Sequence, residues 1–387
     1  MGVYVYLVVL FGVGSGPLVW GRVAAALMRI TQAMLGTRGR AECYVDDTLL
    51  LLKGTKTEIQ QSLRAVILLW RAIGLQLSWA KIERGTQVGW IGATVHIDVK
   101  TQQLHIGIPP KKVKQLETDC SLYLHGKGMV EEAALRAFAG RGSWMSGLLP
   151  QLRPFFRTIW GALAAPRHPS RPHLVFVKQV APALEWLQLL AQDHKEGLLR
   201  VVHLASLDHW GPVIKADASP WGGGALFWKS WHDYKRDLQA NEFMQITWND
   251  KHEQIVQGKI GIPDHQASWE ALMFVISLRH WIGDGTKGKV TIVGDASGII
   301  RDLVAMRAKS RVINNLAKQS AMHLAPLGLE LLGVHVWAEH NTLADELSRA
   351  AQQDRRQPGE ITLALELTGA QRAEPAAPEP ALWAHCV

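Results

Sequence analysis

The stretch from residue 212 to residue 227, PVIKADASPWGGGALF, constrains the fold most, because it places a charged residue at the end of an apolar strand. The apolar residues before Asp217 predict a buried strand that ends there. A carboxylate in such a place is costly to desolvate, so it is usually paired or bound to a cation. Residues 221–227 predict a second strand after a tight turn, with glycines that allow close backbone approach. For this segment taken alone, an exposed Asp in a turn is the alternative.

The chain has 387 residues, enough for two or three domains that each bury a core of their own. Its net charge is +8, and its Lys and Arg residues are spread along the chain, which favours a polyanionic partner such as nucleic acid. The three cysteines are far apart, so neither a disulfide framework nor a Cys-x-x-Cys zinc site is expected. This cysteine usage fits a reducing intracellular compartment, the cytoplasm or the nucleus.

The first twenty residues are apolar, but they match neither a signal peptide nor a membrane span. A basic n-region is missing, glycines interrupt the run, and it falls short of about 18 uninterrupted apolar residues. We therefore expect no membrane partner and interpret the segment as the interior of a fold that begins abruptly.

Two adjacent acidic residues, Asp46 and Asp47, lie between apolar segments that predict the strands of a β-hairpin. Before them, residues 18–35 have the apolar spacing of an amphipathic helix, and a Gly-Ser-Gly-Pro turn precedes that helix at 14–17. In a nucleotidyl-transfer site such a hairpin turn holds divalent metal ions, which bridge the triphosphate and the primer hydroxyl. An ordinary Asp-Asp turn is the alternative.

The sequence Tyr-Val-Asp-Asp at 44–47 resembles the catalytic turn of retroelement reverse transcriptases. Residues 11–17, 74–81 and 88–93 resemble, in the same order, the family's PFGLxSAP segment, its GLxLxxxK stretch and its primer-grip strand. The resemblance implies that Asp46 and Asp47 bind metal and act in catalysis. It also implies contacts with an RNA or DNA template-primer, made by Tyr44, Gly14, Ser15, Pro17, Lys81, Trp90 and Gly92.

The polymerase part departs from the family in one respect. The family's site needs a further Asp on a strand upstream of the glycine-rich turn, and none of the forty-five residues before Asp46 is an Asp. Without that carboxylate strand, the two-metal arrangement cannot form from this chain. We expect an inactive polymerase remnant or a truncated gene model. A full polymerase whose N-terminal half is missing from the sequence is the alternative.

Residues 108–165 contain two helical patterns, 111–124 and 131–146, which in position and character are similar to a reverse-transcriptase thumb. Basic residues of this region either contact phosphates or form an ordinary solvated face; they are Lys111, Lys112, Lys114, Lys127, Arg136 and Arg141. The Pro-rich stretch 165–172 is the best candidate domain boundary, and residues 174–192 are predicted to form one connecting helix.

Two further acidic residues follow Asp217 on predicted elements. After a polar insertion at about 229–262, a helix at 268–281 carries Glu270 in its first turn, where the helix dipole alone would favour an acid. An apolar strand ends in Asp295. If this strand pairs in parallel with the strand before Asp217, both carboxylates emerge at the same edge of the sheet.

Residues 334–349 predict a strand, a short loop and a helix whose start carries Asp345. This segment resembles the closing motif of retroelement ribonucleases H, HxxGxxNxxADxLSR, and residues 217–226 resemble that family's DASxxGxGAxL. The resemblance implies that the family's four metal-binding acids correspond to Asp217, Glu270, Asp295 and Asp345.

Four clustered carboxylates repel one another, so the site is expected to be stable mainly with two Mg²⁺ (or Mn²⁺) ions. The ions would activate a water and stabilise the leaving 3′-oxygen during hydrolysis of an RNA phosphodiester. Specificity for the RNA strand of an RNA:DNA hybrid is implied by the resemblance alone. Either His340 or His335 could assist proton transfer. We favour His340, because His335 lies between two valines in strand alternation.

Together these patterns predict an α+β partial reverse-transcriptase palm at 1–107 and a helical thumb at 108–165, joined by 166–205 to an α/β ribonuclease H-like domain at 206–352 with a mixed five-stranded sheet. The tail, 353–387, is rich in Ala, Pro and Glu and is predicted to be disordered. The expected function is that of a ribonuclease H from a retrotransposon polyprotein, of the LTR or tyrosine-recombinase kind, with other parts of the polyprotein as further partners. A non-catalytic nucleic-acid-binding remnant is the alternative.

Overall fold

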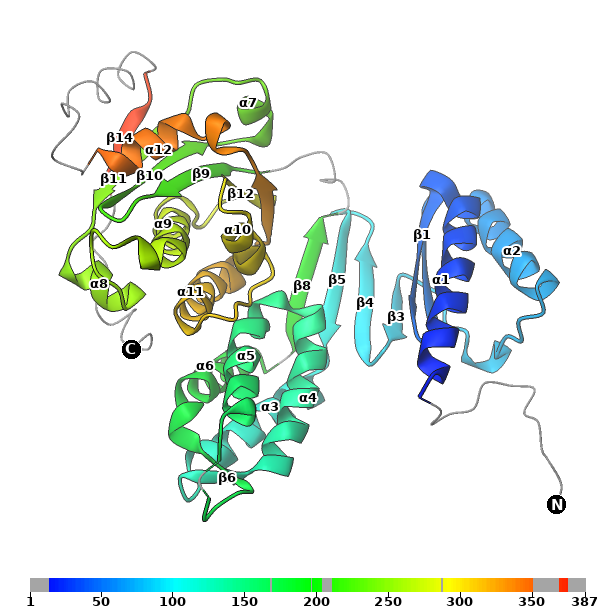
Figure 1. The fold of residues 1–387 in the computed structure, drawn as a ribbon. Coiled ribbons are helices and arrows are strands. Elements are labelled where there is room, and N and C mark those ends of the chain that lie inside the picture. Colours follow the sequence, from blue (N-terminus) through cyan, green and yellow to red (C-terminus); the bar gives the residue numbers. More distant parts are fainter. Residues whose placement is uncertain are drawn as a thin grey trace. The chain divides into compact units, whose positions relative to one another are not determined.

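The computed structural model describes residues 14–167, 169–195, 197–203, 211–286, 288–350 and 369–374. The chain forms two compact units, residues 1–96 and residues 97–387, each with buried residues of its own (Figure 1). The finer division into domains made from the sequence stays a prediction. No helix in these described ranges is both long enough and apolar enough to cross a membrane.

The first unit contains a β-hairpin and two helices (Figure 1). Its elements are α1 (Gly16–Leu35), β1 (Gly39–Tyr44), β2 (Asp47–Leu52), α2 (Lys56–Ala72) and β3 (Gln87–Trp90), with β4 (Ala93–Asp98) at the boundary. β1 and β2 pair antiparallel with Tyr44 opposite Asp47, so Val45 and Asp46 form a two-residue turn. Val45 has a φ of 57°, the left-handed conformation that such tight hairpins require. The predicted helix and the predicted hairpin are confirmed.

The core of this unit lies where α1 meets α2. Leu35, Val66 and Trp70 are buried there, and Trp70 Nε1 donates a hydrogen bond of 2.9 Å to the buried Thr31 Oγ1. The polar end of the indole therefore has a partner although the ring is buried, as a buried Trp requires.

The second unit begins with a helical bundle. Its elements are β5 (Gln103–Ile108), α3 (Pro110–Leu124), β6 (Met129–Glu131), α4 (Glu132–Leu148), α5 (Arg153–Ala164), β7 (Leu174–Phe176), α6 (Ala181–Asp193) and β8 (Leu198–His203). β6 pairs with β7 and β5 with β8, both antiparallel. The two helices predicted at 111–124 and 131–146 are confirmed as α3 and α4.

The single connecting helix predicted at 174–192 is wrong at its start. Residues 174–176 form β7, a 3₁₀ turn follows at Val177–Gln179, and α6 begins only at Ala181. Pro182 explains the late start, because proline is favoured in the first turn of a helix and restricts the residue before it. Val175 is buried in the pairing of β6 with β7, which holds this stretch extended.

A mixed six-stranded sheet follows, with the strand order β13-β12-β9-β10-β11-β14 (Figure 1). Its strands are β9 (Val213–Ala218), β10 (Gly222–Trp228), β11 (Glu242–Thr247), β12 (Val290–Gly294), β13 (Leu331–His335) and β14 (Gln371–Ala373). β9, β10 and β11 form an antiparallel meander, β12 lies parallel to β9 and β13, and β14 lies parallel to β11. The predicted mixed sheet is confirmed, and β9 and β12 do pair in parallel, the condition for bringing Asp217 and Asp295 together.

The predicted count of five strands is wrong, because β14 adds a sixth. It comes from the tail that composition predicts to be disordered, and its backbone pairs with the outer edge of β11. The other tail residues, 353–368 and 375–387, lie outside the described residues. The polar insertion predicted at 229–262 also contains regular structure, since β11 crosses it between α7 (Trp231–Lys235) and α8 (Asp250–Val256).

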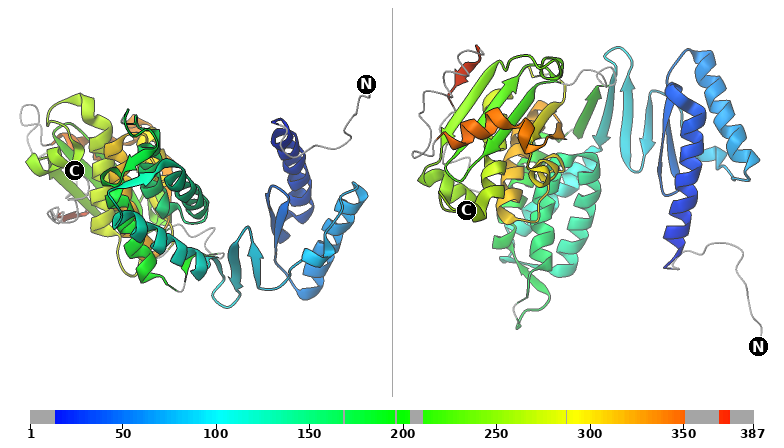
Figure 2. Two further views of the ribbon diagram at one scale, coloured as in Figure 1. Left: turned by 90° about the horizontal axis from the view of Figure 1, so that it is seen from below. Right: turned by 45° about the horizontal axis from the view of Figure 1, so that its top comes forward.

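Helices cover both faces of this sheet (Figures 1 and 2). α9 (Gln266–Trp281) lies on one face with α10 (Ser297–Val304) and α11 (Arg311–Leu327) beside it, and α12 (Thr342–Arg349) packs on β9 and β10 from the opposite face. α9 begins two residues earlier than predicted, so Glu270 lies one turn into the helix rather than in its first turn. The helix dipole therefore does not account for an acid at this position.

The helical bundle packs against the sheet domain within this unit. Asn314, buried in α11, donates from Nδ2 to the carbonyl oxygen of Pro154 at 2.9 Å. The guanidinium groups of Arg153 and Arg157 donate to the carbonyl oxygens of Ala305 and Ala308, each at 3.3 Å. These bonds satisfy polar groups that the packing of α5 on α11 removes from water.

Replacing Gly224 with Ala should destabilise the chain by about 1 to 3 kcal/mol, because the core there has no room for a methyl group. A Cβ at this position of β10 would lie 2.3 Å from Leu347 Cβ and 2.6 Å from Ala344 O, both in α12. Urea unfolding followed by Trp fluorescence measures the loss.

The matched control is Gly298→Ala, in an exposed turn of α10, where a Cβ meets no atom within 4 Å. Its stability should be unchanged or raised by up to about 1 kcal/mol. Equal unfolding midpoints for the two variants would contradict the close packing of α12 on β10.

Candidate metal centre

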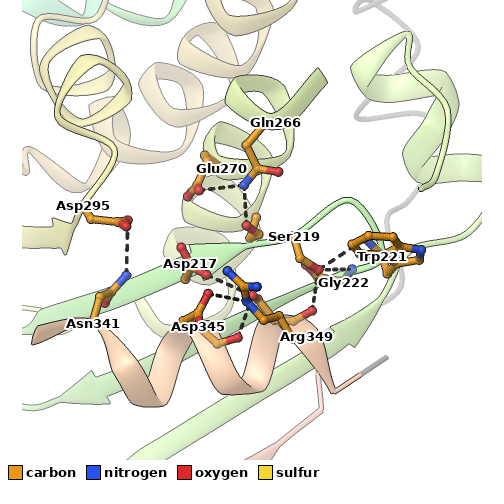
Figure 3. A network of polar contacts seen from close by, with 12 residues as sticks. Asp217, Ser219, Trp221, Gly222, Gln266, Glu270, Asp295, Asn341, Asp345 and Arg349 are labelled. Carbon is orange, nitrogen blue, oxygen red and sulfur yellow. Dashed lines mark hydrogen bonds and ion pairs between the residues drawn. The ribbon is translucent and has the colours of Figure 1, made fainter. Parts of the chain in front are cut away.

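Three carboxylates from three elements of the second unit meet at one edge of the sheet (Figure 3). Asp217 lies in β9, Glu270 in α9, and Asp295 directly after β12, and one oxygen of each lies within 4.8 Å of the others. The parallel pairing of β9 with β12 brings the first and third acids together, with Ile214 opposite Ile292. Of all residues that the structure describes, these three form the one group of acidic, His or Cys side chains that could hold a metal ion.

Burial dominates the electrostatics of the cluster. Asp217 and Glu270 are only 5% and 6% exposed. The pKa of Asp217 is raised from its ordinary value of 3.8 to about 7, mainly by desolvation. A hydrogen bond from Ser348 and the charge of Arg349 oppose this shift, and the charges of Asp295 and Asp345 add to it. Desolvation, together with the charge of Asp217, also holds the pKa of Glu270 well above its ordinary range. The cluster therefore takes up either protons or a cation at neutral pH.

Three polar side chains orient the carboxylates, and no pattern in the sequence had indicated this role for them. Gln266 Nε2 donates to Glu270 Oε1 at 2.9 Å, and Ser348 Oγ donates to Asp217 Oδ2 at 2.9 Å. Asn341 Nδ2 lies 3.4 Å from Asp295 Oδ1. The spacing of Gln266 and Glu270, four residues apart in one helix, was the available signal. Asn341 and Ser348 were visible only as matches to a motif.

The cluster suits a hard divalent cation. Its ligand atoms are all carboxylate oxygens, the donors that Mg²⁺ and Mn²⁺ prefer. Asn341 is 1% exposed, and its Oδ1 has no hydrogen-bond partner among the described residues. An unsatisfied oxygen therefore lies in the side chain that contacts Asp295. Such an atom is costly to bury unless a ligand or water completes its environment.

Asp345, the fourth acid named from the sequence, lies in the first turn of α12 beside this cluster but outside the group of three. Its Oδ1 pairs with Arg349 Nε at 2.6 Å, one turn further along the same helix. Its charge contributes to the raised pKa of Asp217, so the two carboxylates are within electrostatic reach of each other. Its part in metal binding stays a prediction.

The two candidate histidines lie at exposed positions. The His340 side chain is 68% exposed, its Nε2 lies 3.8 Å from Glu339 Oε1, and its backbone carbonyl accepts a hydrogen bond from the Lys215 ammonium group. His335, at the end of β13, makes an edge-on contact with the Trp337 ring, with centroids 5.4 Å apart. The choice of His340 over His335 stays a prediction.

In the first unit, Asp46 and Asp47 lie exposed at the hairpin turn and belong to no group of three metal-binding side chains in the residues that the structure describes. Trp90 Nε1 donates to the backbone carbonyl of Asp47 at 3.2 Å. Tyr44 is exposed beside the turn. The remaining template-primer residues lie at a helix start, in a 3₁₀ turn and in the β3–β4 turn: Gly14, Ser15 and Pro17, Lys81, and Gly92.

In the second unit, Lys111 and Lys112 lie in the first turn of α3. Lys112 Nζ lies 3.5 Å from the centroid of the Trp144 ring, a cation–π contact, and desolvation lowers the pKa of this lysine. The contact between α3 and α4 therefore holds one of the two ammonium groups in place.

Comparison with known proteins finds matches among solved structures alone. Neither a known family profile nor a curated protein sequence matches the chain. Among solved structures, it is similar to a foamy viral protease-reverse transcriptase in complex with RNA/DNA hybrid, with TM-score 0.37, 11% identity, and coverage of 84% of this chain and 38% of that one. A dRH form in complex with double-stranded DNA gives TM-score 0.35, 10% identity, and coverage of 83% and 49%. The chain spans less than two thirds of those proteins' lengths, and similarity at this level does not establish a common fold.

Replacing Asp217 with Asn should flatten the pH dependence of stability in the metal-free protein. Because the pKa of Asp217 is raised from 3.8 to about 7, the folded chain keeps a proton that the unfolded chain has released between these pH values. The wild type should therefore lose stability as the pH rises from about 4 to about 7, on the order of a few kcal/mol. Asn cannot ionise, so the variant should lose much less.

Urea unfolding in a chelator, at a series of pH values, measures this difference. Asp284→Asn, in an exposed turn after α9, is the control and should follow the wild type. Parallel pH profiles for the wild type and Asp217→Asn would show that burial of this carboxyl does not govern the stability of the sheet domain.

Proposed function

We propose that the second unit is a metal-dependent nuclease of the ribonuclease H kind, which hydrolyses the RNA strand of RNA:DNA hybrids. The observation that carries the proposal is the meeting of Asp217, Glu270 and Asp295, from a strand, a helix and the end of a parallel strand. Two of the three are buried without a basic partner among the hydrogen bonds and ion pairs that the structure describes. A cation would offset the desolvation cost of these carboxylates, which protonation otherwise removes.

The chain's own residues would prepare the site in two ways. Ser348, Gln266 and Asn341 each hold one carboxylate oxygen by a hydrogen bond, and so fix the orientation of the three carboxylates. Burial of Asp217 and Glu270 keeps bulk water from screening their charge. Two Mg²⁺ or Mn²⁺ ions bound by these acids and Asp345 would activate water for attack on a phosphodiester and stabilise the leaving oxygen.

The substrate class rests on charge and on the resemblance in sequence. The chain's net charge of +8 favours a nucleic acid, and Lys111 and Lys112 on α3 provide cations in the same unit as the cluster. The motifs at 217–226 and 334–349 resemble ribonucleases H of retroelements, whose substrate is the hybrid. We infer an origin in a retrotransposon polyprotein, and action in the cytoplasm or the nucleus without a membrane partner.

The hairpin with Asp46 and Asp47 is proposed to be an incomplete polymerase site. Its two carboxylates are exposed, and no third acid joins them in the described part of the chain. Exposed carboxylates stay hydrated and bind a single divalent ion weakly, so two neighbouring acids do not hold a pair of ions.

Full-length protein should cleave the RNA strand of a labelled hybrid only when Mg²⁺ or Mn²⁺ is present. Asp217→Asn and Asp295→Asn should each lower the rate by orders of magnitude, because each removes a ligand charge while nearly keeping the shape. Asp284→Asn should cleave like the wild type. Gel analysis of the RNA and DNA strands measures the rate and the strand preference.

Thermal melts separate this proposal from its main alternative. Mg²⁺ at about 100 times its dissociation constant should stabilise the wild type by about 2.7 kcal/mol and leave Asp217→Asn nearly unchanged. If the folded wild type binds hybrid but neither cleaves it nor responds to the metal, the chain is a non-catalytic nucleic-acid-binding protein.

The same protein should not extend a DNA primer on an RNA template, because Asp46 and Asp47 have no third acidic partner in the described residues. Incorporation of a labelled nucleotide measures this, with Asp46→Asn as the reference for background. Incorporation that Asp46→Asn abolishes would contradict the proposal and favour a working polymerase site.

A further inference from the structure

The Arg349 side chain lies at the carboxylate cluster, in the last turn of α12 (Figure 3). Its Nε pairs with Asp345 Oδ1 at 2.6 Å. In Figure 3 the guanidinium group lies beside the carboxylates of Asp345 and Asp217. A positive charge of the chain itself therefore occupies the side of the cluster where the fourth acid lies.

The backbone that carries Arg349 is held firmly. Ser348 Oγ donates to Asp217 Oδ2, and Ser219 Oγ donates to the Ser348 carbonyl oxygen at 2.7 Å. Gly224 lets α12 approach β10 closely, because a side chain there would collide with Leu347. The start of the Arg349 side chain is thus fixed next to the cluster.

The far end of the same side chain is free to move. The Arg349 side chain is 60% exposed and that of Asp345 is 39% exposed. An exposed ion pair of this kind is worth only about 0 to 1 kcal/mol, so the guanidinium group can leave Asp345 at little cost.

We propose that, in the free protein, the Arg349 guanidinium group occupies the place beside Asp345 where a second divalent ion would bind. The group must move away from Asp345 before that ion can bind between Asp217 and Asp345. This rests on the proposed function, since it assumes that the cluster of three binds a first ion. Arg349 acts through Asp345 and is a positioning residue.

Charge balance supports this order of events. With all four carboxylates ionised, Arg349 and one divalent ion leave a single negative charge at the site. While the guanidinium group stays, a second ion is attracted by one net negative charge, and its binding would leave the site with a net positive charge. Once the group has left, two negative charges attract the same ion, and its binding leaves the site neutral. A phosphodiester that enters the site offers the guanidinium group another anionic partner, so nucleic acid promotes its departure from Asp345. The second ion is therefore admitted together with the nucleic acid.

The alternative is that Arg349 only stabilises α12, as ion pairs four residues apart in a helix do. The chain offers a matched control for this role. Arg136 in α4 pairs with Glu132 at 2.6 Å with the same spacing and a similar exposure of 55%, away from the cluster. A purely structural role predicts the same behaviour for Arg349→Gln and Arg136→Gln.

The experiment counts bound Mn²⁺ by electron paramagnetic resonance in full-length protein without nucleic acid. All samples carry Asp46→Asn and Asp47→Asn, so that the exposed hairpin contributes no ion. We expect one ion in this parent protein, in Arg136→Gln and in Arg349→Lys, which keeps the charge. We expect two ions in Arg349→Gln, with the second bound at least about tenfold more tightly than in the parent.

The outcomes separate the two proposals. If Asp217→Asn does not lower the number of ions that the parent protein binds, the metal site and the proposed function both fail. If the parent and Arg349→Gln both bind one ion, or both bind two, the role of Arg349 is overturned while the metal site stands. If Arg349→Lys also binds two ions, the positive charge does not exclude the second ion. Addition of hybrid to the parent should raise the count from one to two, and an unchanged count would contradict the proposed order.

Discussion

The cost of burying the carboxylates of Asp217 and Glu270 is the constraint on which the sheet domain depends. Parallel pairing of β9 with β12 fixes the distance from Asp217 to Asp295, and α9 brings Glu270 to them from one face of the sheet. Hydrogen bonds from Ser348 and Gln266 offset part of the desolvation cost. The pKa of Asp217 stays raised because these bonds do not offset all of it. The burial of two carboxylates at this place in the domain is best explained by a bound ligand that offsets their desolvation cost.

The glycines of β10 let helices pack closely on both faces of the sheet beside the carboxylate cluster. A Cβ on Gly223 would lie 2.3 Å from Met273 Sδ of α9, and a Cβ on Gly224 would lie 2.3 Å from Leu347 Cβ of α12. Adjacent residues of a strand point to opposite faces, so two glycines in succession admit one helix on each side. Glu270 and Asp345 depend on this close approach, because each is carried by one of the two helices.

The two acidic sites of the chain differ in solvation. Asp46 and Asp47 lie exposed at a hairpin turn, where water solvates them, so folding does not desolvate their carboxylates. The cluster in the second unit has lost most of that water and gains far more from a cation. For this reason the proposed activity is assigned to the buried cluster and not to the Tyr-Val-Asp-Asp turn.

The sequence by itself determined the elements whose signals are local. Apolar runs that end in an acid predicted β9 and β12, helical spacing predicted α1, α3 and α4, and the paired Asp predicted the β1–β2 hairpin. Only the tertiary structure decided the contacts between distant residues: β14 joined the sheet beside β11, and Ser348 reached Asp217 across 131 positions. Propensity and periodicity act over a few neighbouring residues, whereas these partners depend on strand register and on how closely α12 packs. A sequence pattern names the acids, and the packing around them decides which of them share a cation.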